Sequence, residues 1–180
     1  MSAAVDAFAQ LRALERGALT HALPLPAQEQ VSEQWRGLGF SLGGTRLVAA
    51  VGEVVEVLGL QGVTRVPRTR AWVMGVANVR GRLLPIVDLA EYLDVEHTGP
   101  RNQRRVLVVE DGELFCGLLV EQSFGMMQFE LQEYDESRRE PAPGRLDGFL
   151  KGAFRLSGRP WRVMDLRSLV REPAFFEVAG

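Results

Sequence analysis

A chain of 180 residues, 46% of them hydrophobic and 24% charged, has the composition of a soluble globular protein with one ordinary domain or two small ones. It contains no run approaching the roughly 18 consecutive apolar residues that a membrane span requires. Its formal net charge of −2 argues against a nucleic-acid partner, which normally needs a basic face. We therefore expect a cytoplasmic protein that neither inserts into a membrane nor binds nucleic acid.

The first segment, residues 1–31, differs from the rest of the chain. Its apolar side chains recur at helical spacing: Val5, Phe8, Leu11, Leu14 and Ala18. This pattern predicts an amphipathic helix, and Pro24 and Pro26 then lead into a polar linker. The segment lacks the basic start and continuous apolar run of a secretory signal. It is either a loosely docked helix or an arm that binds a partner.

From Trp35 onward, short apolar runs separated by turn residues predict β-strands. Residues 39–42 predict a strand, Gly43 and Gly44 a hairpin turn, and residues 45–58 a longer strand that is interrupted or bulged at Gly52. Residues 62–67 predict a further strand that Pro67 ends.

The next hairpin contains the stretch Asn-Val-Arg-Gly. Residues 73–79 and 82–87 predict its strands, Gly81 turns the chain between them, and Asp88 is placed to cap a short helix over residues 89–93.

The second part of the chain repeats this scheme. Strands are predicted over residues 104–109, 113–122, 123–132, 148–156 and 161–164, with an Asp-Gly turn at 111 and 112. Gly81 precedes Asp88 by seven positions, and Gly158 precedes Asp165 by the same seven. A Gly-Arg turn, an apolar strand and an Asp helix cap thus occur twice. Short strands with almost no helix between them predict an all-β fold with two small barrels.

Residues able to perform catalysis are scarce. His21 and His97 have no second ligand at metal spacing, and Cys116 lies in an apolar run as a small hydrophobe. Glu53 and Glu56 fall on opposite faces of a predicted strand and cannot act as an acid–base pair. We expect no enzyme activity, no metal and no cofactor.

One stretch has a specific resemblance. VMGVANVRGRLLPIVDL, residues 73–89, is similar to the signature of the CheW family of chemotaxis coupling proteins. The likeness runs from about Trp35 to Val170 and includes VGEVVEVL, GVTRVP, CGLLVE and WRVMDL. Within that family, the Trp-Arg-Gly-x-Gly-Phe opening and the N-terminal extension most resemble members that serve the type IV pilus chemosensory pathway.

The resemblance implies a fold and a function. It implies two packed five-stranded SH3-like β-barrels over residues 32–175, with short helices, the N-terminal extension 1–31 and a tail at 176–180. It also implies a non-enzymatic adaptor that joins the cytoplasmic tip of a methyl-accepting chemoreceptor to the regulatory domain of a CheA-type histidine kinase. Such an adaptor would be cytoplasmic, recruited to membrane-associated receptor arrays, and would control twitching motility.

Six residues match family positions that bind partners: Val54, Glu56, Gly75, Asn78, Arg80 and Gly81. Each also has a structural alternative. The glycines could serve backbone conformation, Asn78 could close its turn, and Arg80 could form an ion pair with Glu56. If its strand face is solvated, Val54 is an apolar spot suited to a partner contact.

The repeat bears on Arg80 in particular. A residue needed for barrel geometry should recur in both copies, yet Ser157 stands where the second copy would have Arg80. We therefore assign Arg80 to partner coupling. Glu121 stands where the family often has Asp, so partner contacts of the second repeat stay open. A flagellar chemotaxis adaptor, or an SH3-like module with an unrelated ligand, are the alternative functions.

Overall fold

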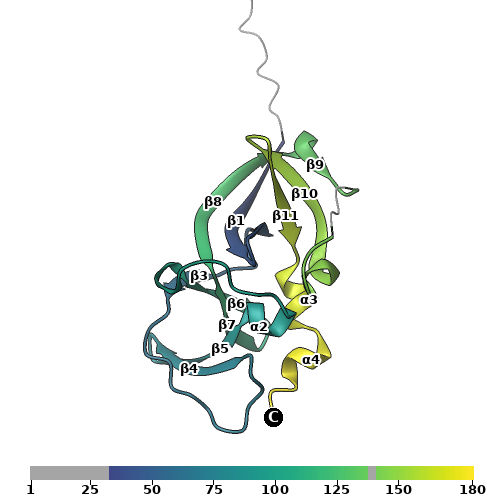
Figure 1. Ribbon diagram of the computed structural model, residues 1–180. Helices are drawn as coiled ribbons and strands as arrows, with labels where there is room; N and C mark the ends of the chain where they lie inside the picture. Colours follow the sequence, from purple (N-terminus) through teal and green to yellow (C-terminus); the bar gives the residue numbers. More distant parts are fainter. Residues whose placement is uncertain (1–32, 138–140) are drawn as a thin grey trace, which may run out of the picture. The chain divides into compact units, whose positions relative to one another are not determined.

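The computed structural model describes residues 33–137 and 141–180, so the expected helix and linker of residues 1–31 lie outside the described residues. The described chain is mostly β, with strands arranged in two sheets (Figure 1). The first sheet has the order β8-β1-β2-β11-β10-β9. Its strands are β1 (Gln34–Leu42), β2 (Thr45–Ala50), β8 (Gln122–Glu130), β9 (Tyr134–Asp135), β10 (Leu150–Leu156) and β11 (Arg159–Met164).

The second sheet has the order β3-β6-β7-β5-β4. Its strands are β3 (Glu56–Gly59), β4 (Val73–Val79), β5 (Arg82–Asp88), β6 (Arg105–Asp111) and β7 (Leu114–Val120). Short helices join or follow the strands: α2 (Leu89–Leu93), α3 (Leu166–Val170), α4 (Pro173–Phe176), and the 3-10 turns Arg101–Gln103, Leu131–Glu133 and Leu146–Phe149. The all-β fold with two SH3-like barrels is confirmed, and the two-residue β9 is the sixth strand of the first sheet.

The two barrels do not correspond to consecutive halves of the chain. The second sheet is built from the continuous segment 56–120, whereas the first combines β1 and β2 with β8 to β11. Parallel pairing of β2 with β11 joins the early and late strands of the first sheet. In the second sheet, parallel pairing of β5 with β7 joins the β4–β5 hairpin to the β6–β7 hairpin. The sequence repeat therefore marks equivalent hairpins, β4–β5 and β10–β11, one in each barrel.

Two strand predictions were wrong. The expected strand over residues 45–58 is two strands in different sheets, because the chain turns at Gly52, whose φ is 91°, and leaves the first sheet. The expected strand over residues 62–67 is a loop with one isolated bridge, between Thr64 and Val76. Pro67 lacks the N–H that a continuing ladder would need.

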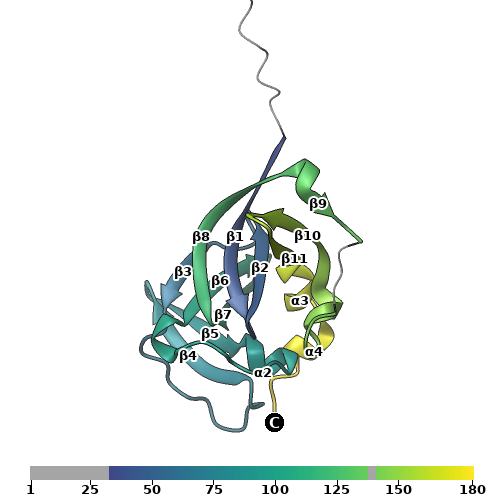
Figure 2. The same cartoon turned by 45° about the horizontal axis from the view of Figure 1, so that its top comes forward.

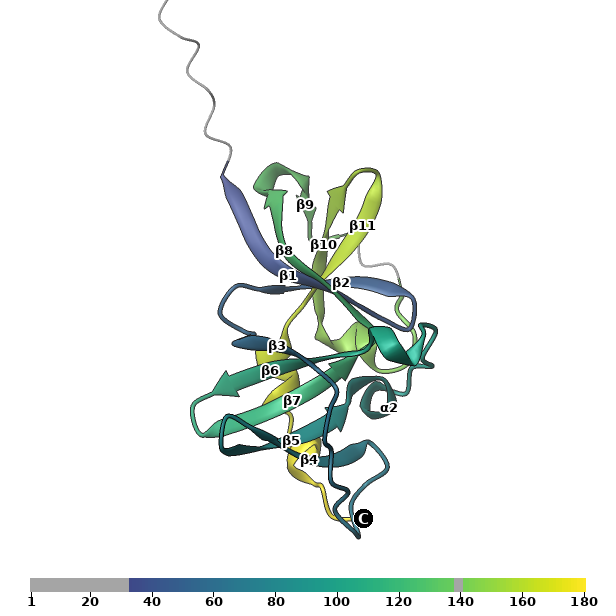
Figure 3. The same cartoon turned by 90° about the vertical axis from the view of Figure 1, so that its left-hand side faces the viewer.

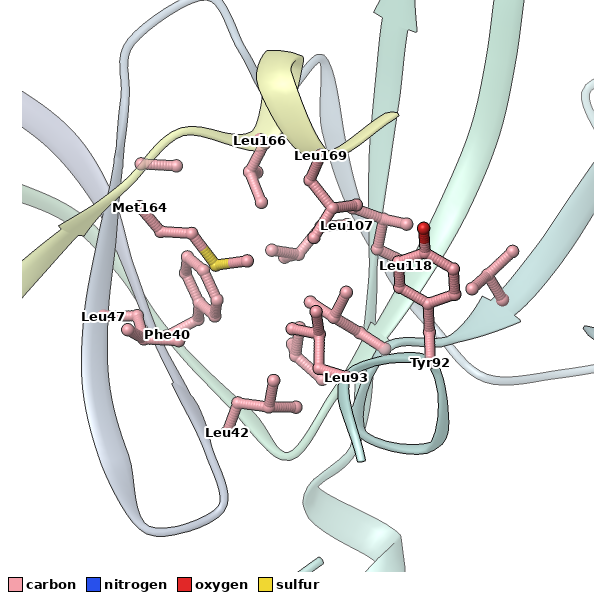
Figure 4. Close-up of a cluster of buried hydrophobic side chains, with 14 of the residues drawn as sticks. Phe40, Leu42, Leu47, Tyr92, Leu93, Leu107, Leu118, Met164, Leu166 and Leu169 are labelled. Atoms are coloured by element: carbon pink, nitrogen blue, oxygen red, sulfur yellow. The ribbon is translucent and has the colours of Figure 1, made fainter. Parts of the chain in front are cut away.

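The main core lies between the two sheets, which Figure 3 shows one above the other. Fully buried side chains from both sheets and from α3 meet there (Figure 4): Phe40, Leu42, Leu47, Leu107, Leu118, Leu166 and Leu169. Burying each such side chain stabilises the fold by about 1.5–3 kcal/mol. Because both sheets contribute, the two barrels share one core, and smaller apolar clusters fill each barrel.

The two predicted helix caps are confirmed. The Asp88 carboxylate accepts hydrogen bonds from the backbone N–H groups of Ala90 (3.1 Å) and Glu91 (3.3 Å) at the start of α2. Asp165 accepts from the N–H of Ser168 (2.9 Å) at the start of α3. Both aspartates satisfy N–H groups that would otherwise have no partner within the helix.

A buried carboxylate ties the two sheets together where the chain crosses from β7 to β8. Glu121 is only 3% exposed. It accepts hydrogen bonds from the N–H of Thr98 (2.6 Å), which follows α2, and from the N–H of Gly44 (3.3 Å), in the β1–β2 turn. Its pKa is raised by burial, but these N–H donors outweigh burial and leave it below its ordinary value. Glu121 therefore holds a loop of the second sheet against a hairpin of the first.

Candidate functional site

The turn between β4 and β5 is the centre of the candidate site. Val79 pairs with Arg82, which leaves a two-residue turn in which Arg80 has φ 52° and Gly81 has φ 82°. Positive φ at both central residues is the type I′ pattern, which favours Asn-Gly and is unfavourable for arginine at the first position. The side-chain oxygen of Asn78 accepts a hydrogen bond from the N–H of Gly81 at 2.9 Å. Asn78 thus closes the turn that forces Arg80 into the left-handed region.

An ion pair connects this turn to the opposite edge of the same sheet. Arg80 Nη2 lies 2.6 Å from Glu56 Oε1. Glu56 begins β3 and Arg80 follows β4, the two edge strands of the five-stranded sheet. The Arg80 side chain is 79% exposed and that of Glu56 28%, so the pair contributes only about 0.2–1 kcal/mol to the fold. Most of the Arg80 side chain remains exposed to solvent.

A cavity of about 350 Å³ lies between these two edges. Eight of its twelve lining residues are apolar: Leu58, Leu60, Val63, Ala77, Val79, Leu84, Ile86 and Val106, with Gly59, Gln61, Asn78 and Arg80 completing the wall. The barrel therefore presents an apolar hollow with a charged group at its rim, the combination that protein and ligand sites commonly show.

Gly75 serves the backbone of this barrel. It is buried, has φ 138°, and a Cβ atom built on it would lie 2.1 Å from the carbonyl oxygen of Thr64. The register of β4 against β5 shifts between Val73 and Gly75, so Gly75 adjoins a bulge, and the loop after β3 approaches its backbone closely. A partner cannot reach a buried glycine directly, so its part in binding would be to shape the surface. A Cβ on Gly81, in contrast, would meet nothing within 4 Å.

The exposed apolar residues beside Glu56 lie on the strand face opposite to the one that Val54 and Glu56 share. Val54 is half-buried and packs against the main core, whereas Val55 is 60% exposed and Val57 36%. Val54 and Glu56 are both half-buried and alternate with the exposed Val55 and Val57, so the expected alternation holds but the face that Val54 shares with Glu56 is not the solvated one. Val55 and Val57 are thus the solvent-facing apolar side chains at this edge, and alternation alone could not say which of the two faces is solvated.

Glu53 and Glu56 have separate partners, and Glu53 lies in the turn after β2 and not on a strand with Glu56 as expected. Glu53 accepts a hydrogen bond from the N–H of Leu166 (3.2 Å), at the start of α3. Burial raises the pKa of Glu53, and the bond from Leu166 opposes this rise. Glu56 instead pairs with Arg80. The two carboxylates belong to different barrels and form no acid–base pair.

The equivalent turn of the other barrel has the same backbone and different side chains. Ser157 has φ 51° and Gly158 has φ 74°, matching Arg80 and Gly81. Position 155, equivalent to Asn78, is an arginine. The left-handed conformation is therefore common to both copies, and what the first copy adds is the guanidinium of Arg80 and the amide that closes the turn.

The described residues contain no group of three or more His, Cys, Asp or Glu side chains suited to hold a metal. Within the same residues, no helix is long and apolar enough to cross a membrane. His97 Nε2 lies 2.9 Å from Asp88 Oδ1, where it supports the helix cap. The site at β3 and the β4–β5 turn is thus a surface with an apolar hollow, an ion pair and exposed valines, features suited to contact with another macromolecule.

Comparison with known proteins gives consistent matches. A family model described as "CheW-like domain" matches residues 36–174. The protein PilI of Pseudomonas aeruginosa is 44% identical over 155 residues, covering 86% of each chain. Chemotaxis protein CheW of Thermotoga maritima is 24% identical over 140 residues, covering 78% of this chain and 90% of that protein.

Among solved structures, the crystal structure of the scaffolding protein TtCheW from Thermoanaerobacter tengcongensis is similar with a TM-score of 0.65. The match has 18% sequence identity and covers 79% of this chain and 91% of that one. At this identity the likeness concerns the fold.

Proposed function

The chain belongs to the family of CheW-like domain proteins, and from this premise we propose that it couples a membrane chemoreceptor to a CheA-type histidine kinase. Membership makes the chain a scaffold of chemosensory signalling, in a family whose members are non-enzymatic adaptors. To this family role the proposal adds three points: the chemoreceptor and the kinase are the partners, the type IV pilus is the output, and the protein is cytoplasmic and recruited to receptor arrays.

The observation that carries this proposal is the exposed Arg80 in its type I′ turn. An arginine in a left-handed turn is unfavourable for the fold, and its exposed pair with Glu56 offsets little of that cost. Function is a sufficient reason to retain it, because arginines are enriched among the residues that dominate binding at interfaces. Val55 and Val57 supply apolar contact area at the same edge.

We assign partner binding to the surface formed by Val54, Glu56, Gly75, Asn78, Arg80 and Gly81. Glu56 and Arg80 offer charged groups, Asn78 and Gly81 fix the turn, and Gly75 and Val54 support the surface from beneath. Identity of 44% with PilI favours the pilus system over a flagellar one.

Two measurements test the proposal. Calorimetry with the regulatory domain of a CheA-type kinase from the same organism should show reversible binding of modest affinity, as suits an adaptor that joins and leaves arrays. Failure to bind any such kinase would refute it. Deletion of the gene should abolish twitching and leave swimming intact; loss of swimming alone would assign the protein to flagellar chemotaxis.

A further inference from the structure

A second cavity, of about 380 Å³, lies on the other barrel where strands β2 and β11 begin. Its wall consists of Gly44, Thr45, Arg46, Arg159, Pro160 and Arg162. None of these residues belongs to the site at β3 and the β4–β5 turn.

The strand register explains why these residues meet. β2 and β11 lie in the same sheet (Figure 2), where they run parallel with Arg162 opposite Leu47. Each strand begins directly after a two-residue turn, formed by residues 43–44 and 157–158. Because parallel strands begin at the same edge of a sheet, arginines more than one hundred residues apart in sequence come together there.

Every charged side chain in the wall of this cavity is an arginine. The Arg46 guanidinium lies over the Trp161 ring, 5.8 Å from its centroid, and Arg162 Nη1 donates a hydrogen bond to the carbonyl oxygen of Pro141 at 3.4 Å. Neither Arg46 nor Arg159 forms an ion pair with another described residue. Two of the three cations are thus uncompensated by the described chain, and one is held in place by an aromatic ring.

Another arginine-lined cavity provides a contrast. Arg65, Arg68 and Arg70 line a hollow of about 370 Å³, but Asp88 and Glu91 form part of the same wall. An anion entering that hollow would meet two carboxylates, whereas one entering the cavity at β2 and β11 would meet none in its wall.

We propose that the cavity at the beginning of β2 and β11 binds a phosphate group. A carboxylate carries one charge and is satisfied by a single bidentate arginine. A phosphate monoester carries a charge of about −1.5 to −2 and three acceptor oxygens, which matches a cavity wall with several arginines better. The Thr45 hydroxyl adds a donor in the same wall.

The phosphate could belong to a free compound such as a nucleotide or to a phosphorylated side chain of a partner protein. Calorimetry on the full chain should therefore compare inorganic pyrophosphate, ATP, a phosphoserine peptide and the same peptide without phosphate. Variants Arg46→Gln and Arg159→Gln remove one guanidinium each, and Arg65→Gln is the matched control in the other cavity. Arg159 is exposed at a strand start, so Arg159→Gln carries the test even if loss of the Arg46–Trp161 contact loosens the barrel.

We expect the phosphate-bearing ligands to bind, and Arg159→Gln and Arg46→Gln each to weaken binding by about tenfold or more, as loss of a charge-assisted hydrogen bond implies. Arg65→Gln should bind as the unaltered protein does. Tighter binding of the phosphopeptide than of pyrophosphate and ATP would identify a phosphorylated partner, and the reverse order a free phosphate compound. Absence of binding, equal affinity in Arg159→Gln, or equal weakening by Arg65→Gln would each overturn the proposal.

Discussion

Replacing Arg80 by asparagine separates its role in coupling from its role in the fold. Arg80→Asn removes the ion pair with Glu56, which lies at 2.6 Å on an exposed surface, and so costs about 0.2–1 kcal/mol. It also gives the turn the favoured Asn-Gly sequence, which recovers part of the about 1–2 kcal/mol that a left-handed arginine costs. The two effects oppose each other, so we expect a net change within about 1 kcal/mol, a shift in Tm of at most about 2–4 °C.

The expected effect on binding is larger. An arginine at the centre of an interface contributes about 2 kcal/mol or more, which corresponds to roughly 30-fold in affinity. Kinase autophosphorylation should be measured with receptor and a titration of the adaptor, alongside thermal unfolding of the adaptor alone. Arg80→Asn should require a much higher adaptor concentration, or fail to restore receptor control, while unfolding almost normally.

Two further variants sharpen the result. Ser157→Asn makes the same turn change in the other barrel, and it should leave coupling unchanged. Glu56→Gln breaks the ion pair but keeps the guanidinium, so retained coupling would show that Arg80 contacts the partner directly. If Arg80→Asn instead unfolds at a markedly lower temperature and its folded fraction couples normally, Arg80 is a structural residue and the reasoning is wrong.

Three other predictions concern stability. Deleting residues 1–31 should leave a single cooperative thermal transition, because the β pattern begins after that segment; a broad transition would place the segment in the core. Glu121→Gln should lower the free energy of unfolding at neutral pH by about 1–3 kcal/mol through weaker bonds with Thr98. The folded pKa of Glu121 is below its ordinary value of 4.5, so its charge stabilises the fold above that pH and loses this effect as the pH falls through the lowered pKa. Urea unfolding should therefore show a smaller difference in stability between the unaltered protein and Glu121→Gln at acid pH than at neutral pH. An equal difference at both pH values would contradict this reasoning. Gly75→Ala should cost about 2–4 kcal/mol, because its Cβ would strike the Thr64 carbonyl at positive φ, and a normal urea midpoint would disprove this close approach.

Local chemistry explains which features could be predicted from the sequence. The Asp88 and Asp165 caps and the Gly81 turn depend on residues within a few positions of one another, and all three lie where expected. The sequence leaves open whether Arg80 forms an ion pair with Glu56, because matching two residues to family positions does not give the distance between their side chains.

Long-range pairing explains what could not be predicted. Whether residues 45–58 continue as one strand depends on where the chain after Gly52 finds hydrogen-bond partners, and those partners lie in β6, about fifty residues later. The cavity of Arg46, Arg159 and Arg162 depends on the parallel pairing of β2 with β11, which are more than one hundred residues apart in the sequence. Neither pairing can be recognised from the hydrophobic periodicity of a short stretch of sequence.

The second sheet's sequence is inserted between β2 and β8 of the first, and this sets an order of events during synthesis. The segment 56–120 can complete its own sheet as soon as it has left the ribosome. The β1–β2 hairpin emerges first, yet its neighbours β8 and β11 follow only after that sheet has passed. At translation speeds of about 5–20 residues per second, the hairpin waits roughly ten seconds for those neighbours, and side chains that pack against β8 and β11, such as Val48, stay uncovered until then. Ribosome pausing within β6 or β7 would lengthen that interval, so the cell's chaperones should meet this protein chiefly through its first two strands.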